Sequence, residues 1–201
     1  MPLEIDYRSL QNHEPMLLDT VRCEAFRQAL FEVVTPESVV LDIGAGTGIL
    51  SIFAAQAGAR AVYAVERSPI AQFAEQLVAD NGFAERVSVL RGEMEELELP
   101  EKVDVIVSEW LGGYAVDENL LPIVIHARDR WLKPEGLMIP GTVTSCLAPA
   151  YDSFLQDDIE FWNSRPYGLD LSAVAREAFQ RTESTCNHIK AKHLPCEAQV
   201  M

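Results

Sequence analysis

Three glycines at alternate positions, Gly44, Gly46 and Gly48, follow an apolar run that contains Asp42. Glycine lets the backbone adopt positive φ angles and approach a ligand closely. The dinucleotide fingerprint G-x-G-x-x-G places its third glycine one residue later than this sequence does. The spacing, with an acid just before the loop, therefore favours a nucleoside ligand without a pyrophosphate over NAD. A purely structural turn is the alternative.

Glu66 supports a ligand site at the same place. It ends a second apolar stretch, residues 61–66, and would lie at the switch point of a parallel sheet. An acid there can accept hydrogen bonds from both ribose hydroxyls, as it does in dinucleotide enzymes. A solvated acid at a strand end is the alternative, and the neighbouring glycine loop favours the ribose role.

Two further acids, Glu109 and Glu118, bracket a glycine-containing loop after another apolar stretch. A hairpin there would bring both carboxylates together, and two like charges in one cleft are costly unless a cation lies between them. A guanidinium is planar and forked and matches carboxylates. Two acids could orient it and localise its charge on the nitrogens away from the attacking one. Two surface acids near a turn are the alternative.

These residues need a scaffold that carries several strand ends to one edge. Strand-like runs alternate with helical patterns: strands at 38–43, 61–66, 87–90, 103–108 and 137–140, and helices at 48–57, 68–81 and 118–132. This alternation indicates a parallel sheet with helices on both faces, whose ligands bind outside the carboxyl ends of the strands. We therefore expect an α/β fold, a Rossmann-like doubly wound sheet over residues 36–140.

Two flanking segments differ from this pattern. A helix is expected from about residue 13 to 33, with Pro15 in its first turn. From residue 141 onward a strand is expected within 142–149, and short helices at 153–163 and 171–179.

The segment Leu41-Asp42-Ile43-Gly44-Ala45-Gly46-Thr47-Gly48-Ile49-Leu50-Ser51, followed by Ala64-Val65-Glu66, resembles the S-adenosylmethionine (SAM) site of class I methyltransferases. More narrowly, the chain resembles the protein arginine methyltransferases from Tyr7 onward. The supporting residues lie at 13–19 with Arg22, at 108–112 with Glu118, at 127–134, at 161–162 and at 167–172.

This resemblance implies roles for individual residues. Glu109 and Glu118 would grip a substrate arginine that accepts the methyl group of SAM. His13 and Arg22 would lie in a helix that covers SAM, with Arg22 pairing with the methionine carboxylate; an i,i+3 pair with Asp19 is the alternative. Glu95 would lie near the adenine, and a solvated acidic loop is the alternative.

The resemblance also implies a domain plan. Residues 1–35 would cover the SAM site, residues 36–140 would bind SAM, and residues 141–201 would hold a partial β-barrel with a dimerisation arm at about 161–179, which makes a homodimer an expectation. The sequence departs from the family where Gly113 precedes Tyr114 and in lacking a Thr-His-Trp loop. Members of the family continue into a β-barrel of which this chain holds only the beginning.

The composition of the chain limits which partners and locations are expected. The net charge of −15 repels nucleic-acid phosphates and would attract a basic peptide, although an acidic surface that serves solubility is the favoured alternative. The resemblance implies that such a partner is an arginine-containing protein or peptide. No apolar run approaches the ~18 residues of a membrane helix, and the first residues lack the pattern of a signal peptide, so a cytoplasmic location is expected. Four soft ligands, Cys186, His188, His193 and Cys196, match no common zinc spacing, which favours an incidental loop over a zinc site.

The sequence therefore predicts a SAM-dependent methyltransferase that acts on an arginine guanidinium of a protein. Three alternatives stay open: a class I methyltransferase for another nitrogen acceptor, a catalytically silent protein that binds SAM or a partner, and a nicotinamide oxidoreductase, which the glycine spacing disfavours.

Overall fold

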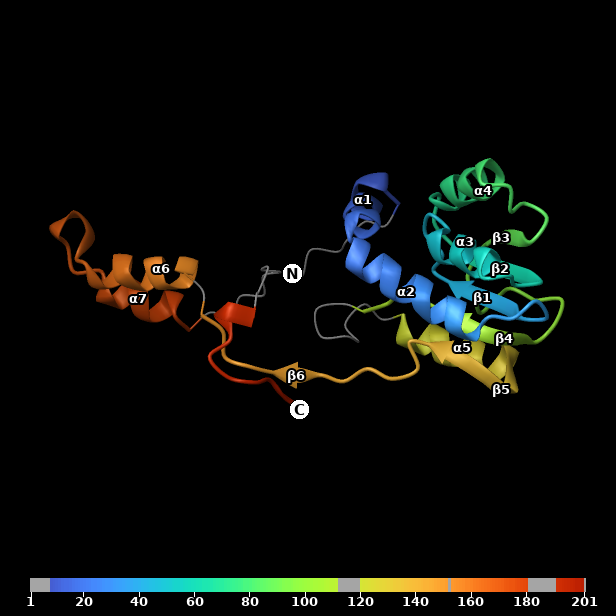
Figure 1. The fold of residues 1–201 in the computed structure, drawn as a ribbon. Helices are drawn as coiled ribbons and strands as arrows, with labels where there is room; N and C mark the ends of the chain where they lie inside the picture. Colours follow the sequence, from blue (N-terminus) through green and yellow to red (C-terminus); the bar gives the residue numbers. More distant parts are fainter. Residues whose placement is uncertain (1–7, 112–119, 152, 181–190, 201) are drawn as a thin grey trace. The chain divides into compact units, whose positions relative to one another are not determined.

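The structure is a computed structural model that describes residues 8–111, 120–151, 153–180 and 191–200. These residues fall into two compact units, which divide between Val143 and Thr144. Within the described part of the first unit, five strands form one sheet in the order β3-β2-β1-β4-β5 (Figure 1). The strands are β1 (Val39–Ile43), β2 (Ala61–Glu66), β3 (Val87–Arg91), β4 (Val103–Val107) and β5 (Leu132–Ile139).

All pairings in this sheet are parallel, and β1 is central. Val40 of β1 pairs with Val62 of β2 on one side and with Val105 of β4 on the other. The chain runs outward from β1 to β3 and then returns to the other side of β1. The direction therefore reverses between β1 and β4, and this switch point is where such sheets bind ligands. The predicted doubly wound α/β sheet is confirmed.

Helices cover both faces of the sheet. Side chains of successive strand residues point to opposite faces, so Val40 packs in one core and Leu41 in the other. The first core also takes residues of α2 (Thr20–Val33), α3 (Ile49–Gln56) and α4 (Ala71–Asp80), and the second takes α5 (Leu121–Trp131). Central strands buried on both faces explain why their sequences are near-continuous apolar runs.

The segment before the sheet forms two helices, α1 (Leu10–Leu18) and α2, so the single helix expected from about residue 13 is wrong. The break falls at Asp19, whose side chain accepts a hydrogen bond from the Arg22 N–H at 3.1 Å and so caps α2. Ser9 caps α1 in the same way, which places Pro15 inside α1. Two capping residues therefore define two helices where apolar spacing alone indicated one.

Strand β5 begins earlier than expected. The strand was expected from residue 137, but it runs from Leu132, and its register against β4 shifts between Val103 and Val105. Asp104 lies at this register shift. Its carboxylate accepts the Val39 N–H at 2.9 Å and pairs with Lys133 at 2.8 Å. These contacts join the amino ends of three strands at the edge opposite the glycine loop.

The second unit contains α6 (Ser153–Asn163), the 3₁₀ helix η1 (Pro166–Gly168), α7 (Ser172–Ala178) and η2 (Ala191–His193). The helices predicted at 153–163 and 171–179 are confirmed. Of the strand expected within 142–149, only β6 (Cys146–Leu147) forms, and it pairs antiparallel with β7 (Gln199–Val200). Across the described ranges, every helix is too short or too polar to cross a lipid bilayer.

Candidate functional site

The glycine loop lies at the carboxyl end of β1. The N–H groups of Gly44 and Ala45 both donate to the Val65 carbonyl at 3.0 Å, which ties the loop to the end of β2. Gly46 and Gly48 have φ angles of +54° and +82°, a region that side chains disfavour. A Cβ on Gly46 would lie 3.0 Å from His13 Cε1, and a Cβ on Gly48 would lie 3.1 Å from Ala74 Cβ. Glycine is therefore required by both conformation and close packing.

Glu66 is buried directly beside this loop. Its Oε2 accepts the Gly46 N–H at 2.9 Å and its Oε1 accepts the Ser68 N–H at 2.7 Å. Two backbone donors thus fix the orientation of the carboxylate. Each carboxylate oxygen has a further lone pair, so Glu66 can still accept hydrogen bonds from hydroxyl groups of a ligand.

Asp42 is fully buried between β1 and α3. Its Oδ2 accepts the Ser51 hydroxyl at 2.6 Å, whereas its Oδ1 has no hydrogen-bond partner. Burial raises the pKa of Asp42 from 3.8 to about 7; the bonds from Ser51 oppose this rise and the charge of Glu66 adds to it. A buried oxygen without a partner is rare, and such groups occur at binding sites.

Helix α1 closes over the loop. His13 is 7% exposed, and its ring lies against Gly46. Three residues further along α1, the Met16 carbonyl accepts a hydrogen bond from Arg22 Nη2 at 2.6 Å. The cover of the loop is thus attached to α2 through Arg22.

Glu109 follows β4, directly beside the glycine loop. Its neighbour Ser108 donates its hydroxyl proton to the Ile43 carbonyl at 2.7 Å, which fixes the end of β4 against the end of β1. Glu109 Oε2 accepts Arg22 Nη1 at 2.7 Å, and Oε1 accepts the Leu111 N–H at 3.1 Å. The sequence alone assigned Ser108 no role in the site. The feature that could have identified it is a polar residue directly after an apolar strand.

The structure brings most of the predicted site residues together. Contacts join His13 to Gly46, Gly46 to Glu66, and Arg22 to Glu109. The Arg22 guanidinium pairs with Glu109, and only its backbone N–H bonds to Asp19, so the alternative surface pair with Asp19 is wrong.

Glu95 takes no part in these contacts. Glu95 is exposed after β3, where its backbone carbonyl accepts Arg130 Nη1 at 3.4 Å. Glu118 lies outside the described residues, and so do Cys186 and His188. Within the described part of the chain, no three His, Cys, Asp or Glu side chains are close enough to hold a metal ion.

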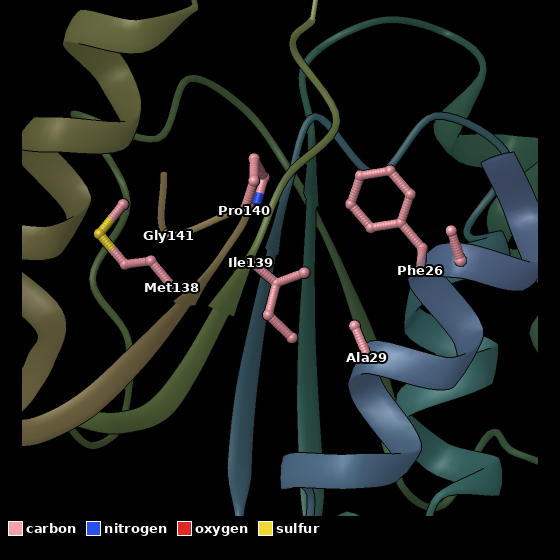
Figure 2. Close-up of a pocket in the computed structure, with 7 residues that line it drawn as sticks. Phe26, Ala29, Met138, Ile139, Pro140 and Gly141 are labelled. Carbon is pink, nitrogen blue, oxygen red and sulfur yellow. The ribbon is translucent and has the colours of Figure 1, made fainter. Parts of the chain in front are cut away.

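An apolar groove of about 360 Å³ lies on the first unit, between α2 and the end of β5. Figure 2 shows Phe26 and Ala29 of α2 on one side and Met138 to Gly141 on the other. None of the residues in the contacts described above lines it. The groove is therefore separate from the polar group around Glu66 and Glu109.

The chain is similar to known methyltransferases. The family model described as "Ribosomal protein L11 methyltransferase (PrmA)" matches residues 23–141, more than half of the chain. Protein arginine N-methyltransferase 6 of Xenopus tropicalis is 44% identical over 188 residues, which cover 90% of this chain and 55% of that protein. Protein arginine N-methyltransferase 1.1 of Arabidopsis thaliana is 46% identical over 170 residues, which cover 83% of this chain and 43% of that protein.

Solved structures agree. The Trypanosoma brucei PRMT1 enzyme-prozyme heterotetrameric complex with AdoHcy superposes with a TM-score of 0.84 at 34% identity, covering 98% of this chain and 62% of that chain. Arabidopsis thaliana protein arginine methyltransferase 10 superposes with a TM-score of 0.75 at 34% identity, covering 96% and 62%. The chain thus spans somewhat more than half the length of most of these proteins. Its sheet, its glycine loop and these similarities show that the chain belongs to the protein arginine methyltransferase family, within the class I methyltransferases that the PrmA model also matches.

Proposed function

We propose that the protein is a SAM-dependent methyltransferase that transfers a methyl group to a guanidinium nitrogen of an arginine in a basic protein or peptide. One observation carries the acceptor assignment: Glu109, held at the end of β4 beside the glycine loop, binds a guanidinium, that of Arg22, at 2.7 Å. A carboxylate that binds one guanidinium has the position and the chemistry to bind another in its place.

The residues around the glycine loop fit SAM as the methyl donor. Gly44, Gly46 and Gly48 let the backbone come close to a nucleoside, and Glu66 retains lone pairs for ribose hydroxyls. The unpartnered Oδ1 of Asp42 leaves an acceptor for a further polar group. Support also comes from the relatives, since the Trypanosoma complex contains AdoHcy and a PRMT6 structure contains SAH.

The remaining assignments follow the family. His13 covers the donor, Arg22 pairs with its carboxylate, and Glu95 lies at its adenine end. We further propose the domain plan given by the sequence, with a cover at 1–35, a donor-binding domain at 36–140 and a partial barrel with its arm at 141–201.

In this reaction the protein orients the arginine guanidinium and determines where its positive charge lies. SAM supplies a methyl group on a positively charged sulfur. An arginine guanidinium has a pKa above ~12 and is a poor nucleophile, so Glu109 and Glu118 hold it and draw its positive charge to the nitrogens that they contact. The free nitrogen would then be the most nucleophilic one and would face the methyl group. As the N–C bond forms, the C–S bond breaks and leaves S-adenosylhomocysteine, and the methylated nitrogen releases a proton to solvent. Positioning and electrostatics of this kind supply much of the rate.

The test combines binding with turnover. We expect calorimetry to show binding of S-adenosylhomocysteine and not of NAD, and labelled SAM to methylate an arginine-rich peptide. Glu109→Gln should lower the methylation rate at least ~10²-fold, the usual cost of losing one electrostatic group, while donor affinity stays within a few-fold. Glu85→Gln, an exposed acid on the loop before β3, is the matched control.

Each alternative has its own result in this test. Methylation of other nitrogen-containing peptides but not of arginine would indicate another acceptor. Donor binding without any transfer would indicate a silent binding protein. NAD binding without binding of S-adenosylhomocysteine would overturn the donor assignment.

We also propose that the protein forms a homodimer through residues 161–179 and acts in the cytoplasm. Support for the dimer comes from the second unit, where Tyr167 is 85% exposed beside the edge-to-face pair of Phe161 and Trp162, and Phe179 is half exposed. Light scattering on the wild type and on Tyr167→Ser tests the dimer, and fluorescence microscopy of a tagged protein tests the location.

A further inference from the structure

Both oxygens of Glu109 are engaged in this structure. Oε2 accepts Arg22 Nη1 at 2.7 Å, and Oε1 accepts the Leu111 N–H at 3.1 Å. The two charged side chains are 27% and 22% exposed, so water screens them only partly. A second guanidinium at Oε2 would meet the positive charge of the first, and two like charges in one partly buried site are unfavourable.

Arg22 is held in this position by more than Glu109. Its Nη2 donates to the Met16 carbonyl at 2.6 Å, and its backbone N–H donates to Asp19 Oδ1 at 3.1 Å. One arginine thus bridges α1, the start of α2 and the loop after β4. Its placement is therefore a defined contact and not a chance pairing on the surface.

The same arginine is next to the donor site. The helix that it holds through Met16 places His13 against Gly46, and the residue before Glu109 bonds to the Ile43 carbonyl at the start of the glycine loop. A donor that carries a free carboxylate brings a competing anion to this neighbourhood. A carboxylate is the group best matched to a guanidinium, so such a donor has the means to draw Arg22 from Glu109.

We propose that Arg22 occupies the acceptor position on Glu109 in the ligand-free protein, and that the carboxylate of the donor displaces it, so that donor and acceptor bind with positive coupling. The inference rests on the proposed function, because it assumes an acceptor guanidinium at Glu109. Such coupling is reciprocal: the acceptor must raise the affinity for the donor by the same factor as the donor raises that for the acceptor.

The coupling is measured with a fluorescent arginine-containing peptide titrated with the 201-residue protein. The peptide affinity is measured without a donor, with saturating S-adenosylhomocysteine, and with saturating 5′-methylthioadenosine. The last compound keeps the nucleoside but lacks the carboxylate. Couplings between sites commonly amount to roughly 5–150-fold, and we expect about tenfold tighter peptide binding with S-adenosylhomocysteine. Methylthioadenosine should leave the peptide affinity unchanged.

Arg22→Gln separates this role from a structural one. Loss of Arg22 should tighten peptide binding in the absence of donor, because Oε2 becomes available, and should abolish the coupling. An arginine that only supported the fold would give weaker peptide binding when removed. Arg27→Gln is the control, since Arg27 lies on the same helix, makes an exposed pair with Glu24 and stacks on Phe31; it should retain the coupling.

The outcomes distinguish this inference from the proposed function. Equal peptide affinity with and without S-adenosylhomocysteine, with binding still weakened by Glu109→Gln, would overturn the inference and leave the acceptor site in place. Equal effects of S-adenosylhomocysteine and methylthioadenosine would overturn it too. Peptide binding in none of the three states would overturn both the acceptor assignment and the inference.

Discussion

At the scale of single residues, three carboxylates of the first unit differ because their surroundings differ. Asp42 is fully buried and has one unpartnered oxygen, Glu66 is held by two backbone N–H groups, and Glu109 is half-buried and paired with a guanidinium. The pKa of Asp42 is raised, because burial without a positive partner disfavours its charged form. Environment, and not residue type, thus sets what each acid can do.

The raised pKa of Asp42 predicts a pH-dependent stability. An unfolded aspartate loses its proton near 3.8, whereas folded Asp42 keeps it up to about pH 7. Between these values the folded state binds more protons, so this residue's contribution to stability falls as the pH rises. The loss is at most about 1.4 kcal/mol for each unit by which the folded and unfolded pKa values differ. Asp42→Asn has no such titration, so its stability relative to wild type should rise between pH 4 and pH 7.

Urea unfolding of both proteins across this range measures the difference. The control is Asp80→Asn, an exposed acid at the end of α4, whose stability relative to wild type should vary far less with pH. A constant difference between wild type and Asp42→Asn across the whole range would contradict the prediction.

Gly46→Ala tests the fit between the loop and α1. The alanine would combine a φ of +54° with a Cβ 3.0 Å from the His13 ring. We expect a loss of about 1–2 kcal/mol from the backbone conformation, and a further loss of donor affinity because the ring must move. Gly82→Ala is matched for conformation, with φ +76° and nothing within 4 Å of its Cβ. The donor affinity measured by calorimetry should fall in Gly46→Ala and not in Gly82→Ala. Equal affinities in the two variants would contradict close packing of His13 on the loop.

At the scale of elements, the regular part of the fold was predictable from the sequence. Buried parallel strands are short apolar runs, and their positions were located within a residue or two for β1 to β4. The break at Asp19 was not predicted, because a polar residue that caps a new helix differs little in sequence from one on the surface of a continuous helix. The early start of β5 was not predicted either, because Pro134 and Gly136 are typical of a turn and the pairing with β4 overrides that preference.

Gly136→Ala tests why a glycine is tolerated within β5. A Cβ there would lie 2.7 Å from Leu132 Cγ and 3.0 Å from the Asp104 carbonyl oxygen. Leu132 Cδ1 would lie closer still, at 2.5 Å, so the Leu132 side chain must turn away and the Asp104 carbonyl must shift. Overpacking of this kind typically costs about 1–3 kcal/mol. Thermal unfolding should show that loss, and an unchanged unfolding midpoint would show that β5 can adjust freely.

At the scale of the whole molecule, the net charge of −15 makes association with a basic peptide dependent on salt. Steering by a protein's field raises association rates by roughly 10–10³-fold, and it weakens as the screening length falls from about 30 Å at 0.01 M to about 8 Å at 0.15 M salt. We expect the association rate of an arginine-rich peptide to fall about tenfold over this range in stopped-flow measurements. A peptide with glutamine in place of arginine is the control, and parallel salt dependences would contradict steering.

The candidate site was predictable in composition but only partly in its contacts. Gly46 and Glu66 were expected near each other because parallel strands end at one edge, and they are joined by a hydrogen bond. The pairing of Arg22 with Glu109 joins residues 87 positions apart, and spacing along the chain carries no information about such a contact. Glu118 stays a prediction, since its position lies outside the described residues.

The two N–H groups on Glu66 have one more consequence, for the kind of sugar that the site admits. Each oxygen of the carboxylate accepts one N–H and can only accept further hydrogen bonds, so it is suited to the O–H groups of an unmodified ribose. A phosphate ester at either hydroxyl would place a second negative charge beside the buried Glu66. It would also remove the hydroxyl group that donates the hydrogen bond. In its proposed role at the ribose, Glu66 would therefore select nucleosides with free hydroxyls over phosphorylated ones.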